Sequence, residues 1–534
     1  MKAGKFAGLQ VCKWMLAVMV LVLIGCHTAV PPSETGQLAI VNSQPPTATP
    51  SPLPTGLPAP PRLSISAPLP TNAPSPTPQP PPLTLQIFAA PSEWASQLDT
   101  LPAHWQLLTT EDPAAVLANG QADAALLHNA NGRIIQQTAL ALTVPFTLDW
   151  QDVTLTQAEE ILTAGHADVV VMPWAEMTPE RRALRVDGRS PTDPDYPLQD
   201  TWSLAAAPQS DVGELAAALQ SPAEAVVQIT AVGDLMLDRS LGWYVQQGDL
   251  AYPFANIADL LRSADVTIGN LECALGSGGT PAAKSFTFRA PPEAAQALAL
   301  AGFDIVNLAN NHALDYGTET LLEGIGLLTD AGVQVVGAGA NNSAAHQPVI
   351  MTMNGLTLAF LGYVSVPVEA VSGFDTASWS ATADSPGLAW ADPERIRADV
   401  TAVKTVVAPQ VDLVIVTLHS GYEYVDSPSP PQIAAAHAAI DAGADVVLGH
   451  HAHVLQGIEF YGDGVIVYGL GNFAFEIDGP PETAVLNLWL DADGVRELEL
   501  VPAVIQFGGQ PRPAEAWEAG PIRQRVYYLS SLLE

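Results

Sequence analysis

One stretch of the sequence decides the fold class: Val446-Val447-Leu448-Gly449-His450-His451-Ala452-His453, a short apolar run that ends abruptly in histidines. Five further apolar runs in the same half of the chain end in polar or glycine-rich clusters, at residues 227–232, 266–268, 305–308, 411–418 and 465–468. Helical patterns lie between several of them, at 293–301, 319–328 and 432–442. This alternation predicts an α/β domain with a site at the carboxyl ends of its strands.

The polar clusters hold carboxylate, amide and imidazole side chains, and five of the eleven histidines fall in them. In chain order the candidates are Asp234, Asp238, Glu272, Asn311, His312, Asp315, His419, Glu423, His450, His451 and His453. Such mixed sets of ligands bind divalent cations of hard or borderline character, including Zn²⁺, Mn²⁺ and Fe²⁺. A lone strand-end Asp is more often a turn residue, and His450 has the alternative of only hydrogen-bonding. As a set, however, the clusters predict one or two divalent metal ions.

The two last histidines of the opening stretch suggest how a metal pair is held. If residues 451–453 are extended, His451 and His453 point to the same side, about 7 Å apart at the backbone. Each could then serve one metal of a close pair.

These motifs resemble those of the poly-γ-glutamate capsule biosynthesis (CapA) family, a branch similar to the calcineurin-like metallophosphatases. The resemblance spans residues 226–508 and implies a four-layer α/β/β/α sandwich. It also implies roles for individual residues: metal ligands at Asp234, Glu272 (in the place of a bridging Asp), Asn311, His419, His451 and His453, with His312 as the acid or leaving-group stabiliser.

Two departures from the phosphatase pattern affect the roles that the resemblance implies. Met236 stands where phosphatases carry a His, and its thioether is a poor ligand for these metals, so that one site is weaker or uses Asp238. The carboxylate expected directly after His312 is displaced to Asp315, which makes Asp315 the candidate catalytic partner of His312.

Basic residues are scarce, with 20 Lys and Arg against 55 Asp and Glu. Arg239, Lys284 and Arg289 stand near the clusters and are candidates to hold an anionic substrate, and a solvated surface position is the equal alternative. Glu423 is a further candidate substrate contact or else a surface charge. The net charge of −35 opposes binding to phosphate backbones, so we expect no nucleic acid partner.

The N-terminus predicts export and a lipid anchor. Three lysines precede an apolar run of about eleven residues that ends at Gly25-Cys26, too short to span a bilayer. Residues 1–26 resemble a bacterial lipoprotein signal with Cys26 as the acylated anchor; an uncleaved signal anchor is the alternative. Residues 27–82 form a Pro-rich linker, since 18 of the 47 prolines lie between residues 31 and 82.

Residues 83–221 form a second, small α/β domain according to the apolar runs at 83–88, 122–127, 139–146, 167–172 and 202–207. Part of it loosely resembles a periplasmic solute-binding domain, and an unrelated α/β spacer is the alternative. Residues 509–534 are interpreted as a C-terminal tail. The whole chain would be a membrane-anchored lipoprotein at the cell surface or in the periplasm.

The leading function hypothesis is a metal-dependent hydrolase of the phosphoesterase type, and a similar site could act on an amide bond. Its cations would lower the pKa of water towards about 7 and clamp an anionic substrate, while His312 protonates the leaving group. The family resemblance implies a role in synthesis, export or anchoring of an anionic polymer, with a membrane-embedded polymer synthase as partner. The alternatives are a non-catalytic, metal-containing polymer-binding accessory module and a tethered solute sensor.

Overall fold

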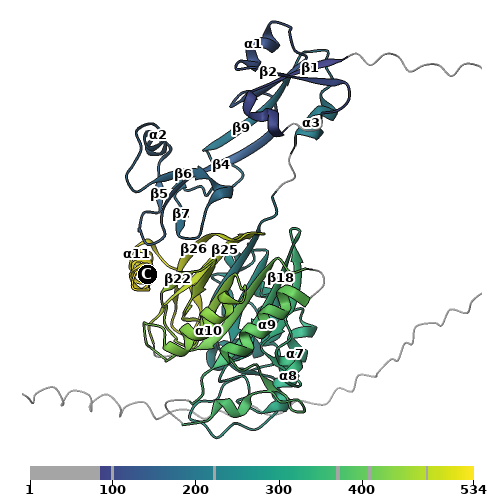
Figure 1. Ribbon diagram of the computed structural model, residues 1–534. Helices are drawn as coiled ribbons and strands as arrows, with labels where there is room; N and C mark the ends of the chain where they lie inside the picture. Colours follow the sequence, from purple (N-terminus) through teal and green to yellow (C-terminus); the bar gives the residue numbers. More distant parts are fainter. Residues whose placement is uncertain are drawn as a thin grey trace, which may run out of the picture. The chain divides into compact units, whose positions relative to one another are not determined.

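A computed structural model describes residues 85–97, 101–220, 224–368, 373–406, 410–476 and 479–533 (Figure 1). The predicted signal with Cys26 and the predicted linker at 27–82 lie outside the described residues. Within the described ranges, no helix combines the length and the apolar character that a membrane span requires.

The larger sheet of the C-terminal half has the strand order β15-β14-β11-β10-β25-β26-β27, with β24 also paired to β10. Its parallel strands are β10 (Val227–Leu235), β11 (Val266–Leu271), β14 (Ile305–Asn307), β15 (Gln334–Val336) and β24 (Asn472–Ala474). The antiparallel strands are β25 (Glu482–Asp491), β26 (Gly494–Ile505) and β27 (Pro511–Pro513). The carboxyl ends of the parallel strands therefore meet at one edge of this sheet.

The second sheet has the order β17-β18-β20-β21-β23-β22. Its four central strands are parallel: β18 (Leu356–Ser365), β20 (Leu413–Ser420), β21 (Val446–His450) and β23 (Gly464–Val467). The antiparallel edge strands are β17 (Val349–Met353) and β22 (Ile458–Tyr461). Strands β18, β20 and β21 are buried along almost their whole length, as continuous apolar runs covered on both faces should be.

Three hydrophobic clusters show that these sheets form four layers. One cluster joins the inner faces of both sheets, with Ile229 and Ile268 from one and Leu358 and Ile415 from the other. A second lies between the larger sheet and α4 (Arg239–Gln246), α5 (Ala258–Leu261), α6 (Ala294–Ala301) and α7 (Thr318–Asp330). A third lies between the second sheet and α8 (Asn342–Ala345), α9 (Pro393–Val406) and α10 (Pro430–Asp441). The predicted four-layer α/β/β/α sandwich is therefore confirmed.

The strands and helices that the sequence predicted for this half are present, the strands as β10, β11, β14, β20, β21 and β23 and the helices as α6, α7 and α10. Short elements connect them: η3 (Tyr252–Phe254), β12 (Ala274–Leu275) paired with β13 (Arg289–Ala290), β16 (Ala338–Gly339) paired with β19 (Gly387–Leu388), and η4 (Thr376–Trp379).

The N-terminal part of the described chain is built on a seven-stranded sheet with the order β2-β1-β3-β9-β4-β6, and β7 also pairs with β4. Its strands are β1 (Gln86–Ala90), β2 (Trp105–Thr109), β3 (Ala124–His128), β4 (Arg133–Pro145), β6 (Val170–Pro173), β7 (Arg181–Ala183) and β9 (Gln199–Ala206), and β5 (Asp152–Val153) pairs separately with β8 (Arg185–Val186). The helices are η1 (Ser92–Gln97), α1 (Pro113–Ala118), α2 (Leu155–Ala164), η2 (Trp174–Glu176) and α3 (Gly213–Leu219). The likeness to a solute-binding domain stays a prediction.

The N-terminal part contacts the sandwich through a buried carboxylate. Glu497 of β26 accepts hydrogen bonds from Trp174 Nε1 (2.7 Å) and from the Ala183 amide (3.0 Å). Residues 509–534, interpreted from sequence as a tail, carry β27 and α11 (Ala516–Ser530). Helix α11 buries Ile522, Val526 and Tyr527 against the core between the sheets, an apolar face that the sequence interpretation overlooked.

Candidate metal centre

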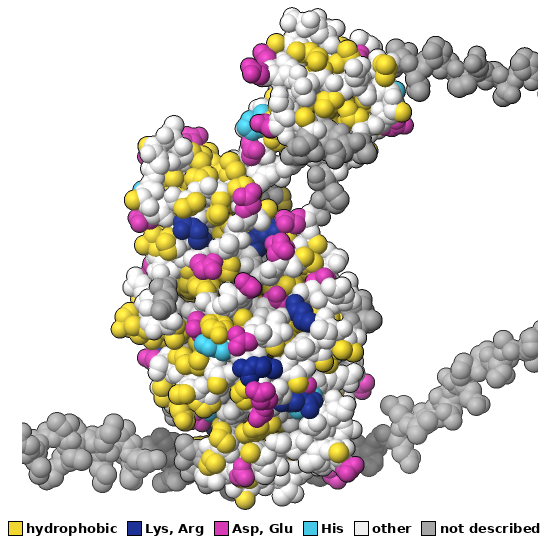
Figure 2. All heavy atoms as spheres, in the orientation of Figure 1, with side chains coloured by type: hydrophobic (Ala, Val, Ile, Leu, Met, Phe, Trp, Pro, Cys, Tyr) yellow, Lys and Arg dark blue, Asp and Glu magenta, His cyan; other side chains and the backbone are white. Residues whose placement is uncertain are grey.

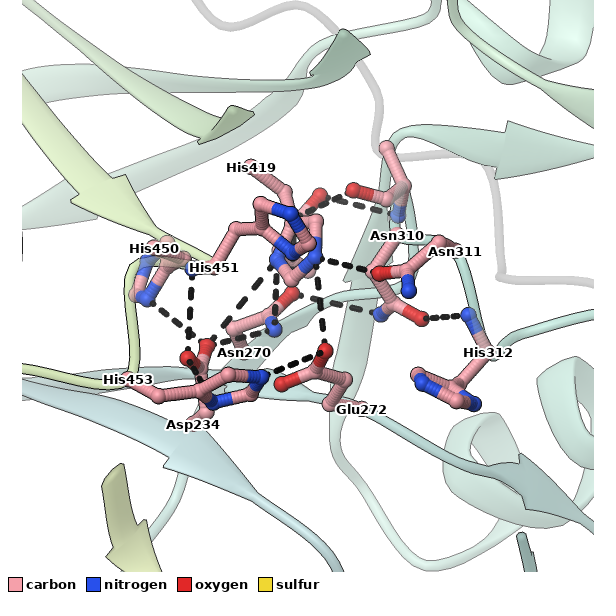
Figure 3. Close-up of polar contacts among 12 residues, drawn as sticks. Asp234, Asn270, Glu272, Asn310, Asn311, His312, His419, His450, His451 and His453 are labelled. Carbon is pink, nitrogen blue, oxygen red and sulfur yellow. Dashed lines mark hydrogen bonds and ion pairs between the residues drawn. The ribbon is translucent and has the colours of Figure 1, made fainter. Parts of the chain in front are cut away.

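The predicted ligands come from five strand ends of two different sheets. Asp234 lies near the end of β10, Glu272 directly follows β11, and Asn311 follows β14. From the second sheet, His419 lies near the end of β20, and His451 and His453 follow β21. Because both sets of parallel strands end at the same place, the six side chains lie together although more than 200 residues separate the first from the last (Figure 3).

Glu272 is the common member of two potential ligand groups. One group consists of Asp234, Glu272 and His419, and the other of Glu272, His451 and His453; within each, one donor atom per residue lies within 4.8 Å of the others. Glu272 Oε1 is 3.4 Å from His419 Nε2 and 3.9 Å from His453 Nε2. A carboxylate shared in this way suits the bridging position that the family resemblance implied for Glu272.

Asn311 completes the arrangement on the side of His419, with its Oδ1 2.7 Å from His419 Nε2. Asp234 is 3.6 Å from His453 Nδ1 through Oδ2 and 3.9 Å from His419 Nδ1 through Oδ1. The structure thus brings all six predicted ligands together, and their role as ligands stays a prediction.

The segment from His451 to His453 is not extended as the sequence interpretation assumed, although both side chains still reach Glu272. Strand β21 ends at His450, and His451 and His453 adopt positive φ angles of 85° and 56°, which are unusual for residues with a side chain. The bend brings the two rings to a centroid separation of 5.9 Å and lets the His451 amide donate to Asp234 Oδ2 (3.2 Å).

The donors fit a divalent cation because they are buried without adequate partners. Both Glu272 oxygens and His451 Nδ1 are buried and have no hydrogen-bond partner among the described residues. Burial, then the charges of Asp234 and Glu423, raises the pKa of Glu272 well above its ordinary value. Burial, followed by the neighbouring His453, lowers the pKa of His451 to about 3. A cation would satisfy both kinds of donor, since it favours an ionised carboxylate and a neutral imidazole.

A hydrogen-bond network that the sequence interpretation missed orients these donors. The Asn270 amide contacts Asp234 Oδ1 (2.8 Å) and His419 Nδ1 (3.1 Å), and its Oδ1 accepts from Asn307 (2.9 Å) and Asn310 (3.2 Å). Three Asn at neighbouring strand ends were the available signal, but each alone is an ordinary turn residue.

Two more residues support the histidines and Asp234. Asn472, the first residue of β24, places its Oδ1 2.8 Å from His453 Nδ1. His450 Nδ1 is 3.5 Å from Asp234 Oδ1. Burial alone would raise the pKa of Asp234, but the contact with His450 and the charges of His450 and His453 lower it.

Met236, which stands in place of a phosphatase ligand, and Asp238, its suggested replacement, both have structural roles. Met236 is fully buried in the apolar cluster under α4–α7. Asp238 caps α4 by accepting from the Arg239 amide (2.8 Å) through Oδ1, and it accepts from the Arg289 amide (3.0 Å) through Oδ2. The expectation that Asp238 replaces the missing ligand is therefore not supported, because both of its oxygens already bind backbone amides.

His312 and Asp315 form the pair that the sequence suggested. His312 Nδ1 is 2.7 Å from Asp315 Oδ2, which also accepts from the Phe288 amide (2.7 Å). Only 7% of His312 is exposed, and its ring packs against that of Phe288 at 4.6 Å. The orienting partner of His312 is thus Asp315, while the catalytic role of both stays a prediction.

The candidate substrate contacts lie around this centre. The Arg239 guanidinium stacks over Phe288 at 5.0 Å, next to His312, and donates to the Glu476 carbonyl (2.8 Å). Arg289 stacks over Tyr316 at 4.3 Å and donates to the Gly278 carbonyl (2.7 Å). Glu423 is exposed, and its charge contributes to the raised pKa of Glu272.

Comparison with known proteins places this centre in a family. Residues 228–477, which contain all six predicted ligands, match the family described as bacterial capsule synthesis protein PGA_cap. The chain is 34% identical over 291 residues to the capsule biosynthesis protein CapA of Bacillus anthracis, covering 53% of this chain and 69% of that protein. The chain belongs to this capsule synthesis protein family.

A second family member gives the same result: the chain is 32% identical over 282 residues to the PGA biosynthesis protein CapA of Bacillus subtilis, covering 52% of this chain and 71% of that protein. Among solved structures, a hypothetical protein from Thermus thermophilus is similar with a TM-score of 0.33 and 16% identity, covering 52% of this chain and 98% of that one. The sulfate thiohydrolase SoxB of the same organism has a TM-score of 0.30 and 14% identity, covering 56% of this chain and 46% of that one.

Proposed function

We propose that this family member is a divalent-metal-dependent hydrolase of the phosphoesterase type that acts on an anionic polymer or its precursor during poly-γ-glutamate or capsule formation. One observation carries the proposal: the Glu272 carboxylate is buried, has no hydrogen-bond partner among the described residues, and belongs to two ligand groups at once. Leaving an unpaired carboxylate buried is costly unless a cation binds it.

The residues divide into two sets around Glu272. Asp234, Glu272 and His419, with Asn311 beside His419, would hold one ion, and Glu272, His451 and His453 would hold the other. Bound there, divalent cations would supply Lewis acidity and attract an anionic substrate group. The identity of the metal among Mn²⁺, Zn²⁺ and Fe²⁺ follows from availability as much as from this mixed donor set.

The proton-transfer role falls to His312. Because Nδ1 faces Asp315, proton exchange with a substrate would run through Nε2, and Asp315 fixes the orientation of the ring. Arg239 would contact a negatively charged group of the substrate from the direction of Phe288.

The proposed location is the cell surface or the periplasm, with the chain tethered to a membrane through an acylated Cys26. Its support is the short apolar run before Cys26 and the Pro-rich segment that follows. The named relatives act in capsule or PGA biosynthesis, and a membrane-embedded polymer synthase is the partner that such a position would serve.

The test combines metal analysis with a hydrolysis screen of the purified mature chain, using phosphomonoesters, phosphodiesters and γ-glutamyl amides. The proposal expects about two metal ions per chain and turnover that His312→Ala abolishes while the metal content stays unchanged. Metal binding without turnover on any of these substrates would replace the enzyme with a polymer-binding accessory module. A chain that binds no divalent metal would overturn both functions.

A further inference from the structure

The ammonium group of Lys284 is buried beside the proposed catalytic pair of His312 and Asp315. Its side chain is fully buried, with no exposed area, and its Nζ is 2.7 Å from Asp315 Oδ1, whose side chain is equally buried. The same Nζ donates to the backbone carbonyl of Asn311 (2.6 Å) and lies 3.3 Å from His312 Nδ1. Lys284 therefore contacts a predicted ligand, the proposed acid and the carboxylate that orients it, and the solvated surface position that the sequence left open is wrong for its side chain.

Aromatic rings from a distant segment enclose this ammonium group. Trp379, the last residue of η4, has its ring centroid 5.1 Å from Lys284 Nζ, and the Phe374 centroid is 6.0 Å away. The two rings also contact each other at 4.9 Å. Such rings attract a desolvated cation through their faces.

Burying this charge is expensive, and basic side chains are scarce in this chain. On the face shown in Figure 2, Lys and Arg side chains appear only as a few separate groups among more numerous acidic ones. A lysine is almost never fully buried unless it is paired, because desolvating an ammonium costs several kcal/mol. An ion pair at this position thus indicates a specific use rather than a gain in stability.

We propose that Lys284 is a positioning residue that clamps the peptide group between Asn311 and His312. The carbonyl that it binds belongs to the peptide bond joining these two residues, so one contact sets the pose of a predicted ligand and of the proposed acid together. Through Asp315 it also fixes the carboxylate that holds the His312 ring. The catalytic meaning of the clamp rests on the proposed function, whereas the clamp itself does not.

Whether metal binding becomes weaker or stronger without Lys284 distinguishes a positioning role of this residue from a purely electrostatic one. Replacing Lys284 by Met removes a positive charge near the ligands and leaves Asp315 without its counter-ion. Both changes would strengthen the binding of a divalent cation if charge alone mattered. If Lys284 acts by holding Asn311 in place, the same substitution weakens binding, since loss of a supporting partner typically costs about 10- to 100-fold in metal affinity.

The experiment measures Mn²⁺ affinity of the full mature chain for wild type, Lys284→Met and the matched control Lys404→Met. Lys404 is likewise paired with an Asp, 3.2 Å from Asp445, but its side chain is only partly buried and it lies on α9, away from the centre. We expect at least a tenfold loss for Lys284→Met and no change for Lys404→Met. Lys284→Gln, which can still donate to the Asn311 carbonyl, should fall between wild type and Met and serves if the Met variant fails to fold.

A second readout needs neither metal nor substrate. In ¹⁵N-histidine-labelled chain, the His312 signals, assigned with His312→Gln, should shift in Lys284→Met and stay unchanged in Lys404→Met. Asp315→Asn should show strong coupling with Lys284→Met in a double-mutant cycle, because the two side chains act as a pair. Unchanged His312 signals, or metal affinity that is equal or tighter in Lys284→Met, would overturn the clamp. A wild-type chain that binds no Mn²⁺ but shows the shift would retain the clamp and reject the proposed function.

Discussion

Replacing Glu272 with Gln should affect the metal-free and the metal-loaded protein in opposite directions. In the metal-free chain, burial, then the charges of Asp234 and Glu423, raises the pKa of this carboxyl well above its ordinary value of 4.5. The folded state therefore binds the proton more tightly than the unfolded state does. This contribution to stability is complete below pH 4.5 and is lost as pH rises through the folded-state pKa.

Because an amide cannot ionise, metal-free Glu272→Gln should match wild type near pH 4.5 and become more stable than wild type at higher pH. The difference should grow by about 1.4 kcal/mol per pH unit from pH 4.5 up to the folded-state pKa of Glu272. With metal the order should reverse where the loss of affinity outweighs this gain: the variant loses a ligand charge shared by both ions, and each tenfold loss of affinity at either ion forfeits about 1.4 kcal/mol of ligand stabilisation under saturating conditions.

Denaturant unfolding between about pH 4.5 and 8, with chelator or with Mn²⁺, measures both effects. The matched control is Glu497→Gln, because Glu497 is also buried but accepts hydrogen bonds from Trp174 and Ala183. The change in stability of that variant, whatever its sign, should be the same with and without metal. The reasoning about Glu272 is refuted if Glu272→Gln is less stable than wild type in chelator at about pH 8, or if it keeps the full metal content.

Three further predictions concern the ligands, their support and the anchor. The double substitution His451→Ala with His453→Ala should abolish stoichiometric metal, measured by mass spectrometry, while circular dichroism shows an unchanged fold; retained metal would defeat the ligand assignment. Asn270→Ala should weaken Mn²⁺ binding about 10- to 100-fold because its amide contacts two predicted ligands, whereas Asn487→Ala, also buried but away from them, should not. Cys26→Ala should move the protein from the membrane to the soluble fraction, and persistent membrane association would favour an uncleaved signal anchor instead.

The α/β character and the position of ligands at strand ends were predictable because both depend on strong, local patterns, whereas the four-layer sandwich was implied by the family resemblance. Each buried strand reads as an apolar run, and the residue after it must lie at the sheet edge, so Asp234 and Glu272 could be placed together without coordinates. His419 belongs to the second sheet, and its place beside them was implied by the resemblance. The backbone bend at His451 was not predictable, since positive φ at a non-glycine residue arises from tertiary constraint rather than from local preference.

The supporting residues were harder to predict because their meaning depends on long-range contacts. Asn270 and Asn472 look like turn residues until Asp234 and His453 are placed beside them. Lys284 lies in a stretch of irregular structure, and its burial depends on Trp379, almost a hundred residues further along the chain. No periodicity or motif in the sequence records such a contact.

The most direct test of the account is anomalous diffraction from crystals of the mature chain grown with Zn²⁺ and measured at the zinc edge. The account predicts two anomalous peaks that share Glu272, one also contacting Asp234 and His419 and the other His451 and His453, with ligand distances of about 2.0–2.2 Å. An absence of peaks at Glu272, or occupied sites formed by other residues only, would contradict it.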